Sequence, residues 1–149
     1  MGKISFSLIL ALALVTIGAS SGSKCVLSGT WRSNWGCLMN VSVLSNGGEF
    51  SGSYQSAAMA TGDNALPSPL HGVQQNVEQK QQPTFGFTVK WQLSESPPTG
   101  ITVFVGQCFV DDQGKEALQT KWLLRKEVRS LRDNWKATRV GTNIFTRVK

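Results

Sequence analysis

The fold is decided by residues 101–125, which read ITVFVGQCFVDDQGKEALQTKWLLR. On both sides of residues 111–114, apolar residues alternate with polar or small ones in steps of two, as they do in β-strands with one buried face. The DDQG sequence in the middle combines turn-forming aspartates with a glycine, which tolerates the positive φ that tight hairpin turns need. The stretch therefore predicts a β-hairpin with strands over 101–110 and 115–125.

The same alternation continues through the rest of the chain, without a strong helical period after the first residues. Asn46, Gly47 and Gly48 form a second hairpin turn, and Pro97 and Pro98 mark a loop because proline cannot donate a ladder hydrogen bond. A helical turn is compatible with residues 126–135. We predict strands over residues 25–33, 37–44, 49–56, 68–78, 84–93, 101–110, 115–125 and 137–148.

Consecutive antiparallel strands with short connections indicate an all-β fold, an eight-stranded antiparallel up-and-down β-barrel. Closure removes the edge strands, and a barrel of this size can hold one small ligand. A seven- or eight-stranded sandwich is the alternative, although the spacing of cysteines and tryptophans does not match that of immunoglobulin domains.

Strand parity places most large aromatic residues on the inward face, together with several hydroxyl groups. The apolar inward residues include Trp31, Phe85, Phe87, Val89, Trp91, Phe104, Trp122 and Leu124, and the hydroxyls are Ser33, Tyr54, Ser56 and Thr102, with Ser94 and Ser96 at a loop mouth. A purely structural core would avoid so many hydroxyls, because each needs a hydrogen-bond partner when buried. Aromatic walls with a few convergent polar groups are typical of a ligand site.

The tryptophans support this interpretation. The chain has five of them beside one tyrosine and one histidine, and Trp31, Trp91, Trp122 and Trp135 lie in separate segments. Indole is the largest apolar side chain and carries one polar N–H group. We interpret these residues as walls around a small, flat, largely apolar ligand; the alternative is that they only fill the core.

The N-terminal residues have the features of a secretory signal. Lys3 precedes a nearly continuous apolar segment over 4–17, and small residues follow over 18–23. We predict a signal peptide over residues 1–23, cleaved between 19 and 23, and one domain over 24–149. Because no second long apolar run follows, we expect no membrane anchor.

Secretion makes the three cysteines candidates for a disulfide. Each pairing of Cys25, Cys37 and Cys108 leaves one thiol over. Parity points Cys25 and Cys108 inward, at strand ends that can lie side by side, which favours that pair. Asn40 begins the sequon Asn40-Val41-Ser42, so Asn40 is a candidate glycosylation site.

The net charge of +6 favours anionic partners such as nucleic acid or sulfated glycans. The lysines and arginines form no run and are not interleaved with aromatic residues, so we interpret them as a solvated surface and expect no specific nucleic-acid partner. His71 has no obvious carboxylate partner, and we find no metal-ligand spacing or phosphate-binding loop. We therefore expect a binding protein that is not an enzyme and needs neither a metal nor a cofactor.

Five stretches carry a family resemblance: QPTFGFTVKW at 82–91, GQCF at 106–109, GKE at 114–116, WLLR at 122–125 and WKATRVGTNIFTR at 135–147. They resemble the avidin family, and the similarity runs from residue 24 to the last residue. In detail the chain is closer to the avian egg avidins and biotin-binding proteins than to the bacterial streptavidins. The resemblance implies a secreted barrel that binds biotin non-covalently and assembles as a homotetramer, with the family disulfide at Cys25 and Cys108.

The resemblance also implies a role for each matching position. Tyr54 matches the tyrosine that donates to the ureido oxygen of biotin, and Ser56 and Asn143 match the groups that accept from its two N–H groups. Thr102 matches the hydroxyl beside the thioether sulfur, and Trp135 the indole that one subunit inserts over its neighbour's pocket. The other positions are Trp91, Phe104 and Trp122 as ring walls, Leu124 on the same face, Ser94 and Ser96 at the mouth, and Ala60 and Thr61 in the loop that contacts the valerate carboxylate.

The departures from the family pattern cluster in residues 33–37. Ser33 and Cys37 stand where the family has asparagine and serine, which donate to the ureido oxygen alongside Tyr54. Serine is shorter than asparagine and a thiol is a weak donor, so we expect reduced biotin affinity. If the strand continues without a bulge, Trp35 shares the inward face, where it replaces a smaller apolar residue and either crowds the pocket or fills space on a different ligand.

Other interpretations stay open at this point. Cys37 is either an inert core residue or a bridge to another chain or a thiol ligand. Lys121 and Thr142 lie where the family has apolar interface residues, so we expect a weaker contact between dimers. The tripeptide Gly29-Thr30-Trp31 also fits the lipocalins, and a lipocalin-like carrier of another small hydrophobic ligand is the alternative function.

Overall fold

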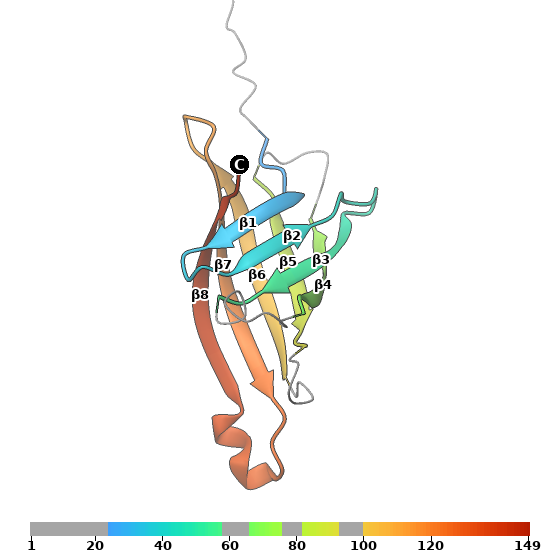
Figure 1. Cartoon of the computed structure of the whole chain (residues 1–149), viewed down its shortest axis with the longest axis vertical. Helices are drawn as coiled ribbons and strands as arrows, with labels where there is room; N and C mark the ends of the chain where they lie inside the picture. The colour runs from blue at the N-terminus through green and yellow to red at the C-terminus, as the bar shows by residue number, and fades with distance from the viewer. Residues whose placement is uncertain (1–23, 58–65, 76–81, 93–99) are drawn as a thin grey trace, which may run out of the picture.

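In the computed structural model, which describes residues 24–57, 66–75, 82–92 and 100–149, the strands close into a barrel (Figure 1). Each strand is antiparallel to the next, and the last pairs with the first. The described residues form β1 Gly29–Ser33, β2 Leu38–Val41, β3 Glu49–Gln55, β4 Ser68–Gln74, β5 Thr84–Lys90, β6 Gly100–Val110, β7 Glu116–Lys126, the 3-10 helix η1 Leu131–Lys136 and β8 Thr138–Arg147. The eight-stranded antiparallel barrel is confirmed, and the sandwich alternative is wrong.

The turn chemistry explains the hairpins. Gly114 has a φ of 78° in the β6–β7 turn, and Asp111 Oδ1 accepts hydrogen bonds from the N–H groups of Gln113 (2.9 Å) and Lys115 (2.8 Å). Gly48 has a φ of 80° in the β2–β3 turn. Both turns were predicted. A helical turn was predicted within 126–135, and the structure has the 3-10 helix η1 at Leu131–Lys136. No helix within the described ranges is long and apolar enough to cross a membrane.

The first strand begins later than predicted. Gly29, with a φ of 123°, separates β1 from residues 24–28. The segment before Gly29 is held instead by the Cys25–Cys108 disulfide, whose Cα atoms lie 5.9 Å apart. The predicted disulfide is therefore confirmed, and Cys37 is left as a free, half-buried thiol.

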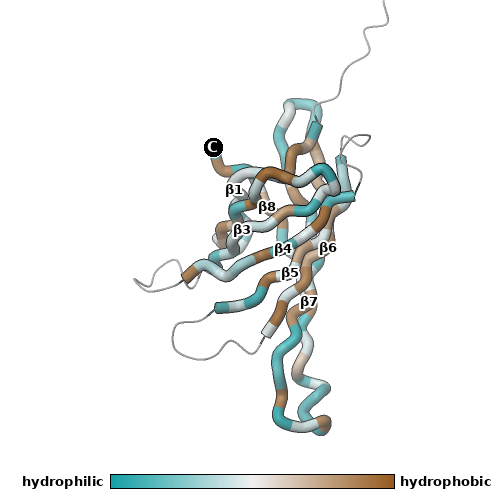
Figure 2. Tube along the Cα trace, turned by 90° about the vertical axis from the view of Figure 1, so that its right-hand side faces the viewer, coloured by the Kyte–Doolittle hydropathy of each residue, from teal (hydrophilic) through white to brown (hydrophobic). Residues whose placement is uncertain are grey.

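The inward faces pack as the parity predicts. The Phe87 ring stacks on Phe104 with centroids 4.5 Å apart and on Phe85 at 6.2 Å. Figure 2 shows the alternation of hydrophobic and hydrophilic residues along the strands, and the mainly hydrophilic end of the β7–β8 hairpin that projects from the barrel. The alternation thus gives the barrel a largely apolar interior and a mixed outer surface.

Trp31 does not form part of a ligand cavity. Its side chain is fully buried, and its indole N–H donates to the Leu27 carbonyl at 2.8 Å. It packs in the same core as Met39, Phe50 and Leu118. The interpretation of Trp31 as a ligand wall is therefore wrong, because its N–H is satisfied by the backbone in the filled part of the barrel.

One ion pair fastens the N-terminal segment to the barrel. Arg147 on β8 donates to both carboxylate oxygens of Glu116 on β7 and to the carbonyls of Val26 and Ser28, and its guanidinium lies 4.2 Å from the centre of the Trp31 ring. Burial raises the pKa of Glu116, but hydrogen bonds from Arg147 and the Val26 N–H outweigh it, so the pKa stays below its usual value. Glu116 therefore carries its charge at neutral pH and pairs with Arg147.

Candidate ligand-binding cavity

A cavity of about 280 Å³ opens at one end of the barrel. Its walls come from the β1–β2 turn, β3, β6, β7, β8 and the residue that follows β5. They are formed by Trp35, Cys37, Tyr54, Trp91, Thr102, Phe104, Trp122, Leu124 and Asn143. Each of these residues was a predicted site residue, and the structure places them around one cavity.

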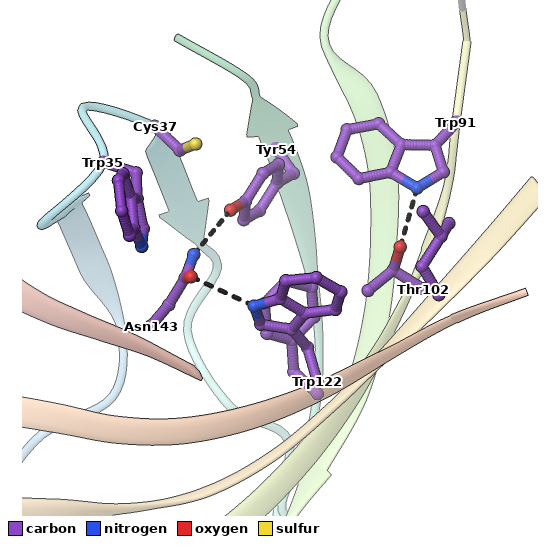
Figure 3. Close-up of a pocket in the computed structure, with 9 residues that line it drawn as sticks. Trp35, Cys37, Tyr54, Trp91, Thr102, Trp122 and Asn143 are labelled. Carbon is purple, nitrogen blue, oxygen red and sulfur yellow. Dashed lines mark hydrogen bonds between the residues drawn. The ribbon is translucent and has the colours of Figure 1, made fainter. Parts of the chain in front are cut away.

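The cavity contains a chain of polar groups within its aromatic walls (Figure 3). Trp122 Nε1 donates to Asn143 Oδ1 at 3.1 Å, and Asn143 Nδ2 donates to the Tyr54 hydroxyl oxygen at 3.4 Å. Separately, Trp91 Nε1 donates to Thr102 Oγ1 at 2.8 Å. Since both hydroxyls act as acceptors in these bonds, each keeps its own proton for donation to a ligand.

Aromatic rings surround Tyr54. Its ring meets Trp91 edge to face at 5.5 Å and lies 5.5 Å from Phe104, and the residue is 2% exposed. Burial raises the pKa of its hydroxyl far above the usual value; the neighbouring Cys37 thiol raises it further, and the Asn143 hydrogen bond lowers it in part. Tyr54 is therefore a neutral donor in the folded protein.

We predict that Tyr54 will not ionise while the protein is folded. Because Tyr54 is the one tyrosine of the chain, tyrosinate absorbance reports on it alone. An unfolded tyrosine loses its proton near pH 10 and the folded one does not, so the unfolded state is favoured as pH rises above about 10. In an alkaline titration, absorbance should rise together with loss of near-ultraviolet circular dichroism. Tyrosinate formation near pH 10 in a protein that remains folded would contradict the prediction. The variant Tyr54→Phe, which has no tyrosine, gives the absorbance baseline.

The segment from Ser33 to Cys37 is a turn and not a continuous strand, in agreement with the predicted strands over 25–33 and 37–44. β1 ends at Ser33, a turn built on Gly36 (φ 81°) follows, and β2 begins after Cys37. Ser33 Oγ accepts from the N–H groups of Trp35 (3.2 Å) and Cys37 (3.0 Å). Ser33 is buried but is not among the cavity-lining residues, since its hydroxyl serves the turn.

Trp35 still reaches the cavity from this turn. Because the strand has ended, its side chain is 69% exposed rather than buried, yet it lines the cavity together with Cys37. The strand therefore does not continue through residues 33–37, but Trp35 and Cys37 still lie at the predicted site.

The other predicted residues either do not line the cavity or lie outside the described residues. Ser56 follows β3 and does not line the cavity, and Trp135 is 83% exposed on η1. Ala60, Thr61, Ser94 and Ser96 lie outside the described residues, as does the predicted signal peptide over 1–23.

Part of the outer face of β6, β7 and β8 is apolar and surrounds Lys121. Lys121 Nζ donates to Thr142 Oγ1 at 3.1 Å, and both residues are exposed. Around them, this surface exposes Val103, Val105, Leu123 and Val140. On the other side of the barrel, the Asn40 side chain is also exposed and accepts from Thr30 Oγ1 at 2.7 Å.

Every described residue that lines the cavity was among the predicted site residues, but one contact between two of them was not predicted. Trp122 and Asn143 are 21 positions apart and share a hydrogen bond because β7 and β8 pair. The register of two strands set this contact, and no local sequence signal specifies it.

Comparison with known proteins agrees with this geometry. The model of the avidin family matches residues 21–148. Avidin of Gallus gallus is 51% identical over 142 residues, which cover 95% of this chain and 90% of that protein. The structure of a biotin-binding protein from chicken is 58% identical with a TM-score of 0.73, covering 85% of this chain and 98% of that one. The structure of xenavidin is 43% identical with a TM-score of 0.72, covering 85% and 100%.

Proposed function

Because the chain belongs to the avidin family, we propose that it binds biotin non-covalently in the cavity at the end of its barrel. The observation that carries the proposal is the enclosure of Tyr54, Asn143 and Thr102 by Trp91, Trp122 and Phe104 in one cavity. A buried urea needs a partner for its oxygen and for both N–H groups, and an apolar bicycle needs flat walls.

The polar groups fit the ureido ring of biotin. The free proton of Tyr54 donates to the ureido oxygen. Asn143 Oδ1 already accepts from Trp122 and has a second lone pair for one ureido N–H group. Ser56, just after β3, accepts from the other N–H group, and the Thr102 hydroxyl contacts the thioether sulfur. Ala60, Thr61, Ser94 and Ser96 contact the valerate carboxylate.

The affinity of this site is proposed to be lower than that of family members with asparagine and serine at positions 33 and 37. The Ser33 hydroxyl oxygen is engaged by the turn, and the Cys37 thiol is a weak donor. Tyr54 is then the main donor to the ureido oxygen. Each missing hydrogen bond to a buried acceptor costs about 1–3 kcal/mol.

We also propose that the protein is a secreted binding protein and not an enzyme, with a signal peptide over residues 1–23 and a mature domain over 24–149. The Cys25–Cys108 disulfide supports secretion, because disulfides persist in oxidising compartments. The exposed side chain of Asn40 supports glycosylation at its sequon. No cofactor is needed for non-covalent binding.

Assembly is proposed to be a homotetramer in which Trp135 covers the neighbouring subunit's cavity. An indole that is 83% exposed gains from burial in a contact. The apolar surface around Lys121 supports a second contact between copies, and its ammonium weakens that contact because desolvating an unpaired charge is costly.

Calorimetric titration of the purified protein with biotin tests the function. We expect one biotin per chain, bound more weakly than by chicken avidin measured in parallel, and a tetramer by light scattering. Absence of heat and of thermal stabilisation by biotin would refute the proposal. Displacement of biotin by retinol or a fatty acid would favour a lipocalin-like carrier instead.

A further inference from the structure

Trp35 combines a fixed backbone with a loosely packed side chain. Ser33 Oγ accepts from the Trp35 and Cys37 N–H groups, and the Gly36 N–H donates to the Ser33 carbonyl at 2.9 Å. Asn34 N–H donates to the Ile144 carbonyl at 2.8 Å, and the Ile144 N–H returns a bond to Asn34 Oδ1 at 3.0 Å. These contacts anchor the turn to β8 immediately beside Asn143, which lines the cavity.

The indole that this turn carries has little protein around it. It lines the cavity but is 69% exposed, whereas Tyr54 on β3 is almost completely buried. Figure 3 shows Trp35 and Trp91 on opposite sides of the cavity, with Tyr54, Asn143 and Trp122 between them. A flat ligand that occupies this space therefore covers apolar surface of Trp35 that the apo protein leaves in water.

We infer that Trp35 is a lid which the chain supplies to its own cavity, and that it sets how slowly the ligand leaves. The inference rests on the proposed function, with biotin as the ligand. The turn is already ordered by hydrogen bonds, so placing the indole over the ligand costs little conformational entropy. The ligand must lose its contact with Trp35 before it leaves, so this contact slows dissociation.

This lid differs from the one proposed for Trp135. Trp135 lies on η1 and does not line the cavity of its own chain, so its effect depends on assembly. Trp35 lies beside the cavity of the same chain and acts in any oligomeric state. A subunit that has lost its neighbour therefore keeps one indole against its ligand.

The variant Trp35→Leu tests the inference, with the dissociation of a fluorescent biotin measured after addition of excess biotin. We expect release about tenfold faster, the change for roughly 60 Å² of lost apolar contact. The same acceleration should occur in a Trp135→Leu background, because the two lids act independently. Val43→Ala is the matched control: it removes exposed apolar surface away from the cavity and should release at the wild-type rate.

The outcomes separate this inference from the proposed function. If the wild-type protein binds no biotin, the proposed function fails. If it binds biotin but Trp35→Leu releases it at the wild-type rate, or more slowly because Trp35 crowds the site, then the lid is refuted and the proposed function stands. The midpoint of thermal unfolding without biotin should be equal in the wild type and Trp35→Leu, since the side chain is mostly exposed.

Discussion

Biotin affinity is expected to rise about 30-fold or more when Ser33→Asn and Cys37→Ser are combined. Ser33 Oγ is an acceptor for two turn N–H groups, and an asparagine oxygen can take that role while its Nδ2 donates to the ureido oxygen. A serine at position 37 replaces a weak thiol donor with a stronger hydroxyl in the cavity wall. Two recovered hydrogen bonds of about 1–3 kcal/mol each give a gain of this size. Calorimetry, or competition where binding is too tight, measures the change in Kd.

A ligand control isolates the proposed contact. Desthiobiotin keeps the urea and should show the same gain. Iminobiotin has a nitrogen in place of the ureido oxygen and, when protonated, offers a donor there, so its binding should not tighten. An unchanged Kd for biotin would mean that Ser33 and Cys37 do not limit affinity. An equal gain with iminobiotin would place the effect in the shape of the turn rather than in donation to the oxygen.

Replacing Arg147 with alanine is expected to lower the free energy of unfolding by about 2–3 kcal/mol, because it removes one partner of a partly buried ion pair and its charge-assisted hydrogen bonds. Glu116, whose side chain is 16% exposed, would lose its cation. The carbonyls of Val26 and Ser28 would lose their hydrogen-bond donor, and the Trp31 ring would lose its contact with the guanidinium. The midpoint of thermal unfolding should fall by roughly 6–15 °C for a domain of this size. Urea denaturation with the disulfide intact measures the change.

The exposed pair between Lys136 and Asp133 is the matched control. Their charged atoms lie 2.7 Å apart on η1, but both side chains are exposed, so Lys136→Ala should leave the midpoint unchanged. If both variants unfold like the wild type, the Arg147 contacts are not stabilising. If Arg147→Ala/Glu116→Gln is as stable as the wild type, the cost in the single variant comes from the unpaired carboxylate alone.

The barrel could be predicted because its signals are local. The DDQG turn, the parity of Phe85, Phe87 and Phe104, and the glycines of the hairpins each report their conformation over a few neighbouring residues. Among the described residues that line the cavity, alternation predicted Tyr54, Trp91, Thr102, Phe104, Trp122 and Leu124, whereas Asn143 was predicted from the family resemblance alone. Alternation was wrong for Trp31, because parity shows which face a side chain shares and not how far along the barrel the cavity extends.

Sequence by itself determined the strand order, the turns and the set of inward side chains, since a period of two and a glycine in a turn act within a few residues. Only the tertiary structure decided which inward residues meet. The pairing of β7 with β8 joined Trp122 to Asn143, and the hydrogen bonds between Asn34 and Ile144 placed the turn that carries Trp35 beside the cavity. These contacts depend on register and barrel closure, which bring together residues about twenty to more than a hundred positions apart, beyond the reach of any local pattern.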